Sequence, residues 1–550
     1  MKNFVSYLLK CTLGLSLVTL PTIAGAQDAQ KPAVVVSLAS VEQLMGNVGY
    51  LTRMAGSPEV GAIITIMSGQ YIEGLDTKQP AGGYLAFAPQ PSGVVFLPVS
   101  DFDTVVAKIE ETLGELEDVG GGVKKLKLQR EIFLREMDGW VFASDQRVNL
   151  DNVPADPKKL LEGLYETYDV AIRANMQSVP AELRQMVISE IKEGFERTVA
   201  SEQDEDKRRA QKEIGGRVID RIVRFADEAD QLTVGWGTAS EEGKTYLDFS
   251  ATALAGTTLA DEIDSAVTMK SDFAGFLIPD AAATFHFAAP VLEDDIEQTV
   301  LMLNAARDKA LEAIDKDENL QSDEARVTAK DIVGSLMNVL RKTIEAGKLN
   351  GGAALVLEPQ NINFVAGGFV ADGKTVENDL KRLVELAKQT KDNSGIEVKF
   401  DVATHGGVAL HTIVVPVPAH EEDARKVLGD KMVAVVGTGA TSVYFAFGND
   451  SMELLKQVID GSVAANAKTS PMTLNVALTP ILEFAASVDD DPIVAGLAEA
   501  LKNSQGKDHV AISSKAIPRG VAYRVEVEEG VLQLIGQAAK LKNAQDRDPF

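Results

Sequence analysis

Short runs of alternating apolar and polar residues recur along this chain and come in closely spaced pairs. Two such runs separated by a few turn residues are typical of a β-hairpin. Asp138-Gly139 and Gly406-Gly407 are the clearest turns between paired runs. The predicted strands cover 34–38, 83–88, 94–99, 123–128, 132–136, 140–143, 232–236, 245–251, 353–357, 363–370, 398–404, 408–415, 441–447, 508–513 and 520–527.

Apolar residues spaced three or four apart predict amphipathic helices between these strands. Ser40 and Asp101 stand directly before two such patterns, where an N-cap residue is expected. The stretch from Asp156 to about Asp230 is helical in character. Further helices are predicted at 259–267, 293–315, 325–346, 376–388, 451–459 and 530–541.

Strands that occur in hairpins call for antiparallel sheets, because parallel neighbours need long crossover connections. The sequence therefore predicts an α+β fold, with antiparallel sheets built from β-hairpins and amphipathic helices on one face. The order of hairpins and helices recurs, which predicts two diverged copies of one unit at 33–270 and 271–545. A helical insertion at about 157–230 is expected in the first copy only.

The N-terminus has the pattern of an export signal. Basic residues within the first ten positions precede an apolar run at 11–23 and the small-x-small pattern Ala24-Gly25-Ala26. The apolar run is too short to span a bilayer comfortably. We therefore predict a signal peptide at 1–26 and a periplasmic or extracellular mature protein, with a retained N-terminal anchor as the alternative.

Composition narrows the partners of the mature chain. The only cysteine, Cys11, lies in the predicted signal peptide, so an exported chain without disulfides is expected. The apolar content of 45% over 550 residues is enough for more than one core. The net charge of −27 is spread along the chain and repels phosphate backbones, so nucleic acid is not expected as a partner. No transmembrane segment is expected after signal cleavage.

Short motifs in the first quarter of the chain resemble a known group of proteins. These are Ser40-Val41-Glu42-Gln43-Leu44, Gly74-Leu75-Asp76, Gly82-Gly83-Tyr84 and Phe96-Leu97-Pro98-Val99-Ser100-Asp101. They are similar to segments of large exported proteins of unknown function from bacteria of the planctomycete type, chiefly over 34–145. The resemblance implies export and carries no catalytic residue, cofactor or ligand.

Three of the five histidines, His405, His411 and His420, lie within sixteen residues and are the first candidates for a metal site. Zinc needs three or four ligands that converge at about 2 Å. A strand rises about 3.3 Å per residue, which separates His405 from His411 by roughly 10 to 20 Å. We predict that these histidines do not form a metal site.

Three other candidate binding motifs do not meet the requirements of a binding site. The acidic stretch 315–319 would need glycine where Leu320 stands and glutamate where Arg326 stands to be a calcium loop. The acidic run 489–491 suits a helix start, where carboxylates interact favourably with the helix dipole. The glycine-rich segment 437–441 lies between two strands, whereas a phosphate-binding loop opens a helix.

The sequence contains no serine nucleophile elbow and no zinc-protease motif, and the mature chain has no cysteine nucleophile. We therefore expect a non-catalytic exported protein with no cofactor, which binds a partner or forms part of an assembly. A periplasmic carrier of lipid or another apolar ligand is the first alternative, and a hydrolase without a recognisable motif is the second. In the carrier alternative, the candidates to line a cavity are Phe285, Phe287, Leu301, Leu303, Leu336 and Leu340, although residues of this kind are more often ordinary core.

Overall fold

The computed structural model describes residues 31–69, 71–87, 91–317, 320, 322–388, 395–464, 470–489, 491–502, 504 and 506–545. The chain forms two compact units. Unit 1 consists of Met1–Ile263 and Ile517–Arg524, and unit 2 of Asp264–Ala516 and Val525–Phe550. The predicted signal peptide at 1–26 lies outside the described residues. Within the described ranges, no helix is both long enough and apolar enough to cross a bilayer.

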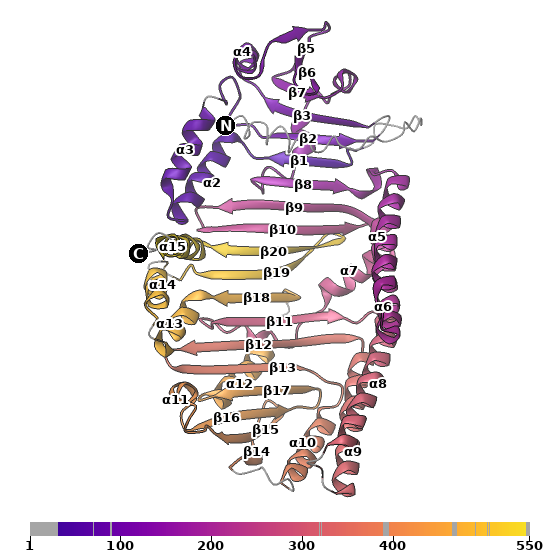
Figure 1. The fold of residues 1–550 in the computed structure, drawn as a ribbon, viewed down its shortest axis with the longest axis vertical. Helices are drawn as coiled ribbons and strands as arrows, with labels where there is room; N and C mark the ends of the chain where they lie inside the picture. Colours follow the sequence, from indigo (N-terminus) through magenta and orange to yellow (C-terminus); the bar gives the residue numbers. More distant parts are fainter. Residues whose placement is uncertain are drawn as a thin grey trace. The chain divides into compact units, whose positions relative to one another are not determined.

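Unit 1 is built on antiparallel strands in the order β4–β5–β6–β7–β3–β2–β1–β8–β9–β10. Figure 1 labels this order from β5 to β10. The strand bounds are β1 Val34–Leu38, β2 Ala81–Ala86, β3 Ser92–Pro98, β4 Leu116–Asp118, β5 Val123–Lys127, β6 Glu131–Met137, β7 Trp140–Ser144, β8 Val170–Asn175, β9 Ala229–Ala239 and β10 Lys244–Ala253. Asp138 and Gly139 turn between β6 and β7 with φ of 53° and 78°, as the Asp-Gly pair predicts.

Helices fill the connections of unit 1. Their bounds are α2 Val41–Met54, α3 Pro58–Gly69, α4 Phe102–Leu113, α5 Ala181–Ser201, α6 Glu205–Glu228 and α7 Thr258–Thr268, the last of which crosses the unit boundary. The two predicted N-caps are confirmed. The Ser40 hydroxyl accepts the backbone N–H of Gln43 at 3.2 Å, and the Asp101 carboxylate accepts the N–H of Asp103 at 3.1 Å.

Unit 2 is also built on antiparallel strands, in the order β14–β15–β16–β17–β13–β12–β11–β18–β19. The strand bounds are β11 Ala283–Pro290, β12 Lys348–Glu358, β13 Asn361–Phe369, β14 Glu397–His405, β15 Val408–Pro416, β16 Lys431–Thr438, β17 Ser442–Gly448, β18 Met472–Ala477 and β19 His509–Ile517. The chain continues into β20 (Gly520–Glu528), whose residues divide between the units after Arg524.

The helices of unit 2 lie between these strands along the chain. Their bounds are α8 Glu293–Lys316, α9 Asp323–Glu345, α10 Gly373–Ala387, α11 Glu422–Leu428, α12 Ser451–Ala464, α13 Leu478–Val488, α14 Pro492–Lys502 and α15 Glu529–Gln545. Helix α12 packs Leu454, Leu455, Val458 and Ile459 into the buried face of the sheet, beside Val365 and Tyr444.

The two units share one strand order. Adding ten to each strand number in β4–β5–β6–β7–β3–β2–β1–β8–β9 gives the order found in unit 2. Helix pairs occupy the same connections, since α2 and α3 follow the first strand as α8 and α9 follow β11. The predicted α+β class with antiparallel sheets is confirmed. Descent of the segments 33–270 and 271–545 from one duplicated unit stays a prediction, which the matching order supports.

The segment 157–230 differs from its predicted helical character. It contains β8, which pairs with β1 on one side and β9 on the other. Strands β1 and β8 are far apart in the sequence, so no hairpin pattern predicts β8. Moreover, α5 and α6 connect β8 to β9 as α13 and α14 connect β18 to β19, so a helical pair at this point is common to both units.

The two faces of the unit 1 sheet are packed differently. One face carries the aromatic core, in which Phe96 and Phe142 are completely buried. The Phe96 ring lies 5.7 Å from Trp140 and 6.2 Å from Phe142, centroid to centroid. Successive residues of a strand point to opposite faces, so their sequence neighbours lie on the other side of the sheet. That second face carries the candidate site.

We predict that Phe142→Ala lowers the free energy of unfolding by about 3–5 kcal/mol, because it removes a fully buried ring from a packed face. The matched control is Phe249→Ala on β10, whose side chain is 44% exposed and which should cost less than about 1 kcal/mol. Urea denaturation followed by circular dichroism measures both. Equal losses would contradict the assignment of the core to the Phe142 face.

Candidate functional site

An apolar cavity of about 400 Å³ lies in unit 1, on the face of the sheet opposite the aromatic core. Its floor follows from the strand register. A row of residues in direct register crosses the sheet and lines the cavity, and its members are Val36, Gly83, Val95, Ala143 and Leu134. The alternation of side chains thus gives each strand one face for the core and one for the cavity.

Helix α4 forms the opposite wall. Val105, Ile109 and Leu113 recur every four residues, which places them on one side of the helix, and all three line the cavity. The Asp101 cap fixes where α4 begins, with its carboxylate also accepting the Thr104 hydroxyl at 2.6 Å. An amphipathic helix therefore covers the apolar floor without filling the space above it.

Glycine at position 83 leaves the middle of the floor without a side chain. Gly83 stands between Val36 and Val95 in the cross-strand row. A Cβ atom there would lie 3.0 Å from the carbonyl oxygen of Val94, closer than side chains ordinarily approach a backbone. No side chain of β2 therefore projects into the cavity from position 83.

The opening of the cavity is marked by the lining residues that solvent reaches. Tyr71 is 39% exposed, the Glu73 side chain 55% and the Lys108 side chain 34%. The opening therefore lies between α4 and the segment that follows α3. Lys108 Nζ is 3.2 Å from both Glu73 and Glu111, and hydrogen bonding to Glu73 first, then Glu111, raises its pKa. The cation at the rim is thus already neutralised by two carboxylates.

The apolar floor continues beyond the cavity. Ile172 on β8 pairs with Val36, Val234 on β9 pairs with Ile172, and Phe249 on β10 pairs with Val234. Their exposed fractions are 47%, 41% and 44%. An exposed apolar strip therefore runs along the same face from the cavity floor.

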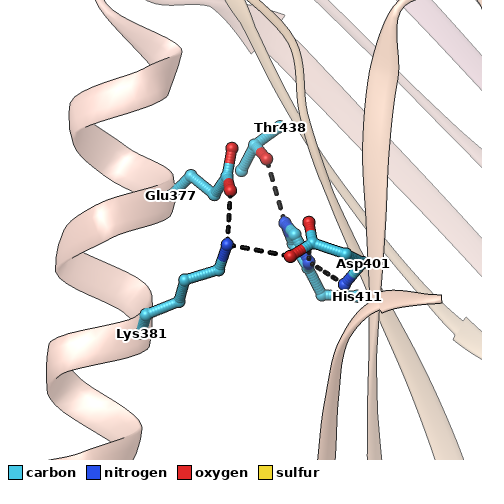
Figure 2. A network of polar contacts seen from close by, with 5 residues as sticks. All are labelled: Glu377, Lys381, Asp401, His411 and Thr438. Atoms are coloured by element: carbon cyan, nitrogen blue, oxygen red, sulfur yellow. Dashed lines mark hydrogen bonds and ion pairs between the residues drawn. The ribbon is translucent and has the colours of Figure 1, made fainter. Parts of the chain in front are cut away.

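A polar network on three strands and a helix of unit 2 is the second candidate (Figure 2). Lys381 Nζ lies between two carboxylates, 2.6 Å from Glu377 Oε1 and 3.0 Å from Asp401 Oδ2. The imidazole of His411 lies beside Asp401 and reaches Thr438 Oγ1 with Nε2 at 3.0 Å. Glu377 and Lys381 project from α10, and the other three residues come from β14, β15 and β16.

The backbone fixes the tautomer of His411. Its Nδ1 accepts the backbone N–H of Asp401 at 3.0 Å, so the proton of the neutral ring is on Nε2, which donates to Thr438. The side chain is completely buried, and this burial lowers its pKa. Asp401 has φ 54° where the register between β14 and β15 shifts. His411 therefore holds a bulge in β14 in place.

Glu377, Asp401 and His411 have ligand atoms close enough to surround a metal ion. The lone pair of His411 Nδ1 is already used, and the Lys381 ammonium lies between the carboxylates. Hydrogen bonds to Glu377 and then Asp401 raise the pKa of Lys381, and the same contact lowers the pKa of Asp401. The group is a self-compensated ion-pair network, and its chemistry does not fit a metal ligand set.

The second acidic cluster with a histidine also has internal partners. Glu528 Oε2 accepts the backbone N–H of His509 at 2.9 Å and lies 3.0 Å from its Nδ1. Because a carboxylate only accepts, this contact places the proton on Nδ1. Asp508 accepts the N–H of Thr479 at 2.6 Å and so fixes the start of α13. These contacts anchor the N-terminus of α13 and the start of β19.

The histidines singled out in the sequence have separate partners. His405 Nε2 lies 2.8 Å from Asp460 Oδ1, whereas the His420 side chain is 79% exposed and lies 3.4 Å from Glu421. His411 is buried in the network described above. That the three bind no metal stays a prediction, which these separate partners support.

The other sequence candidates have structural roles where they are described. The segment 437–441 turns between β16 and β17, with Gly439 N donating to Ser442 O at 2.8 Å, as predicted. Asp491 accepts the N–H of Ile493 at 2.8 Å at the start of α14. Asp315 pairs with Lys330. The rest of the acidic stretch 315–319, which was not expected to bind calcium, lies partly outside the described residues, as does residue 490.

The apolar residues proposed for a ligand cavity lie in unit 2, away from the cavity found in unit 1. Phe285 and Phe287 stack at 5.4 Å on β11, and Leu301 and Leu340 are 57% and 44% exposed. None of the six lines the unit 1 cavity. The sequence does contain a signal for the unit 1 cavity, namely the apolar–polar alternation in β1, β3, β6 and β7 and the apolar spacing of α4. The alternation alone does not show which face of the sheet packs against α4, because the strand register decides that.

Comparison with protein-family models, curated proteins and solved structures found no match. Function therefore depends on what the chain's own residues arrange in space. Of the two candidates, the polar network in unit 2 stabilises a strand bulge. The cavity in unit 1 is an apolar space that is open to solvent on one side, and concave apolar clefts are the usual form of a small-molecule site.

A second buried histidine provides a contrast to His411. His286 on β11 is completely buried, and neither ring nitrogen has a hydrogen-bond partner among the described residues. Burial lowers its pKa as it does that of His411. Because both folded-state values lie below 6.5, the unfolded chain takes up protons first as the pH falls. Their contribution to stability is complete above about pH 6.5 and is lost as the pH falls through the folded-state values.

We predict that His286→Phe leaves the melting temperature at about pH 7.5 unchanged or raises it, and weakens its fall towards about pH 5.5. His411→Phe should instead cost about 1–3 kcal/mol at about pH 7.5, because the Asp401 N–H loses its acceptor. Thermal melts across this pH range separate the two. A loss from His286→Phe as large as that from His411→Phe would show that the His286 ring has a polar partner.

Proposed function

We propose that this protein is an exported, non-catalytic carrier of an uncharged apolar ligand, which it holds between α4 and the sheet of unit 1. The observation that carries the proposal is the cavity of about 400 Å³ and its aliphatic lining. This volume falls within the range of small-molecule sites, roughly 300–1,000 Å³. A partner-binding or structural role alone would not require an apolar cavity of this size.

The energetics of such a site favour a flexible hydrocarbon. Each methylene that leaves water contributes about 0.8 kcal/mol, so about ten methylenes contribute about 8 kcal/mol. That is roughly the free energy of micromolar binding, before the cost of immobilising the ligand is subtracted. The exposed strip of Ile172, Val234 and Phe249 offers further apolar contact to a ligand longer than the cavity.

The rim favours a ligand without negative charge. Lys108 is paired with Glu73 and Glu111, and Asp145 also lines the cavity. A carboxylate headgroup would meet these acidic side chains and the net charge of −27. A long-chain alcohol of equal length avoids this repulsion and can still hydrogen-bond at the rim.

Export and the lack of catalysis belong to the same proposal. The signal-like pattern at 1–26 and the resemblance to exported planctomycete-type proteins support a location outside the cytoplasm. The non-catalytic assignment is supported by His411, whose two ring nitrogens are committed to the Asp401 backbone and Thr438.

We predict that Ala143→Phe weakens ligand binding at least about tenfold, because the new ring fills the cavity from its floor. Binding is measured by uptake of N-phenyl-1-naphthylamine and its displacement by 1-hexadecanol. The control Ala464→Phe makes the same change at the exposed end of α12 in unit 2 and should leave binding intact. A wild-type protein that takes up neither compound would refute the carrier proposal.

We further predict a preference for 1-hexadecanol over hexadecanoate that the acidic rim creates. The double variant Glu73→Gln/Glu111→Gln releases Lys108 from both ion pairs, so its affinity for hexadecanoate should rise by roughly three- to tenfold. Affinity for 1-hexadecanol should hardly change, which serves as the internal control. An unchanged selectivity would place the headgroup away from this rim.

A further inference from the structure

Helix α3 exposes an apolar surface that no described residue of unit 1 covers. Val60 is 44% exposed, Ile63 53%, Ile66 78% and Met67 38%. Between residues 60 and 72 the sequence has no Asp, Glu, Lys, Arg or His, although a quarter of the chain is charged. Contiguous apolar surface of this kind marks contact with a partner or a membrane.

The orientation of α3 is set by its contact with α2. Gly61 is buried against α2, where an added Cβ would collide with the Thr52 hydroxyl and approach Gly49 Cα at 3.4 Å. At 100° per residue, Ile63 and Ile66 lie on the side of the helix opposite Gly61. The close packing of Gly61 therefore turns the apolar side chains of α3 outward.

The end of α3 leads along the chain to the opening of the cavity. Ile66 and Met67 lie in the last turn, and α3 ends at Gly69. Tyr71 follows two residues later, lines the cavity and is 39% exposed. The apolar helix surface and the cavity opening are thus adjacent along the chain.

We propose that α3 docks unit 1 onto an uncharged lipid surface, so that the apolar ligand passes between that surface and the cavity. This inference rests on the proposed function, because a ligand of that chemistry resides in lipid rather than in water. The exposed surface consists of aliphatic side chains, whereas protein interfaces are enriched in aromatic and arginine anchors with polar rims. Tyr71 has the apolar ring and polar tip that suit a membrane–water boundary.

Charge selects the kind of lipid. Interfacial helices that bind anionic membranes carry Lys and Arg on their polar face. Helix α3 has only Glu59 as an ionised residue, and the net charge of the chain is −27. Negative lipid would therefore repel the protein, and a zwitterionic surface leaves only the apolar contact.

The test is flotation of the full chain with phosphatidylcholine vesicles and, separately, with phosphatidylglycerol vesicles. The wild type should float with the first and at least about tenfold less with the second. Ile63→Glu/Ile66→Glu should reduce flotation with phosphatidylcholine at least about tenfold. The control Met186→Glu/Val187→Glu alters side chains on α5 that are 59% and 58% exposed and should float as the wild type does.

The same variants separate this inference from the carrier proposal. Uptake of N-phenyl-1-naphthylamine without vesicles should be unchanged in Ile63→Glu/Ile66→Glu. Wild-type uptake without flotation would overturn docking alone, and flotation without uptake would leave docking supported and refute the carrier. Equal loss of flotation in the α5 control would also overturn docking by α3.

If circular dichroism shows that Ile63→Glu/Ile66→Glu does not fold, a second variant still tests the docking of α3. Ile66→Trp adds an indole in place of the most exposed large apolar side chain of α3. Brominated phosphatidylcholine quenches indoles that enter the acyl region. The variant should be quenched more than the wild type, whose two tryptophans are Trp140 and Trp236. Equal quenching would overturn the docking of α3.

Discussion

The register of the antiparallel sheet in unit 1 is the constraint on which the rest of that unit depends. Pairing Val36 with Gly83 and Gly83 with Val95 directs one set of side chains to the cavity and leaves Phe96 and Phe142 on the other face. A shift of one residue in any strand would exchange the two faces. The aromatic core thus fixes the register, and the register in turn forms the cavity floor.

The two units show how one strand order yields different interiors. In unit 1, the helix between the third and fourth strands turns Val105 and Ile109 to the sheet, and space remains beneath it. In unit 2, α10 occupies the same connection and presents Glu377 and Lys381, again four residues apart, to a polar network. Charged side chains there need partners, so the network closes on itself through Asp401 and His411. Aliphatic side chains have no such requirement and can border an open space.

Much of the fold could be predicted from local patterns, whereas the site could not. Hairpins such as β6–β7 are encoded within a few residues, with Asp138-Gly139 as the turn, and the caps Ser40 and Asp101 act locally. Strand β8 was missed because its partner β1 lies far away in the sequence. Helix α3 was also missed, because its β-branched residues suit strands and only packing of Gly61 on α2 decides otherwise. The cavity needs the register of five strands and the position of α4, none of which a local pattern contains.

An apolar cavity has a cost in stability that helps to explain where it lies. Side chains around an empty space lose dispersion contacts on one side. In unit 1 the opposite face compensates, since Phe96, Phe142, Leu150 and Leu161 are completely buried there. The wall formed by α4 is positioned by its Asp101 cap, by the packing of Ile109 and Leu113 against the Leu126–Ile132–Leu134 cluster, and by the Lys108–Glu73 ion pair. A ligand that fills the space would restore the missing contacts on α4 and stabilise the unit by mass action. The tightly packed face of the unit 1 sheet thus provides the stability that allows the opposite face to keep an unfilled cavity.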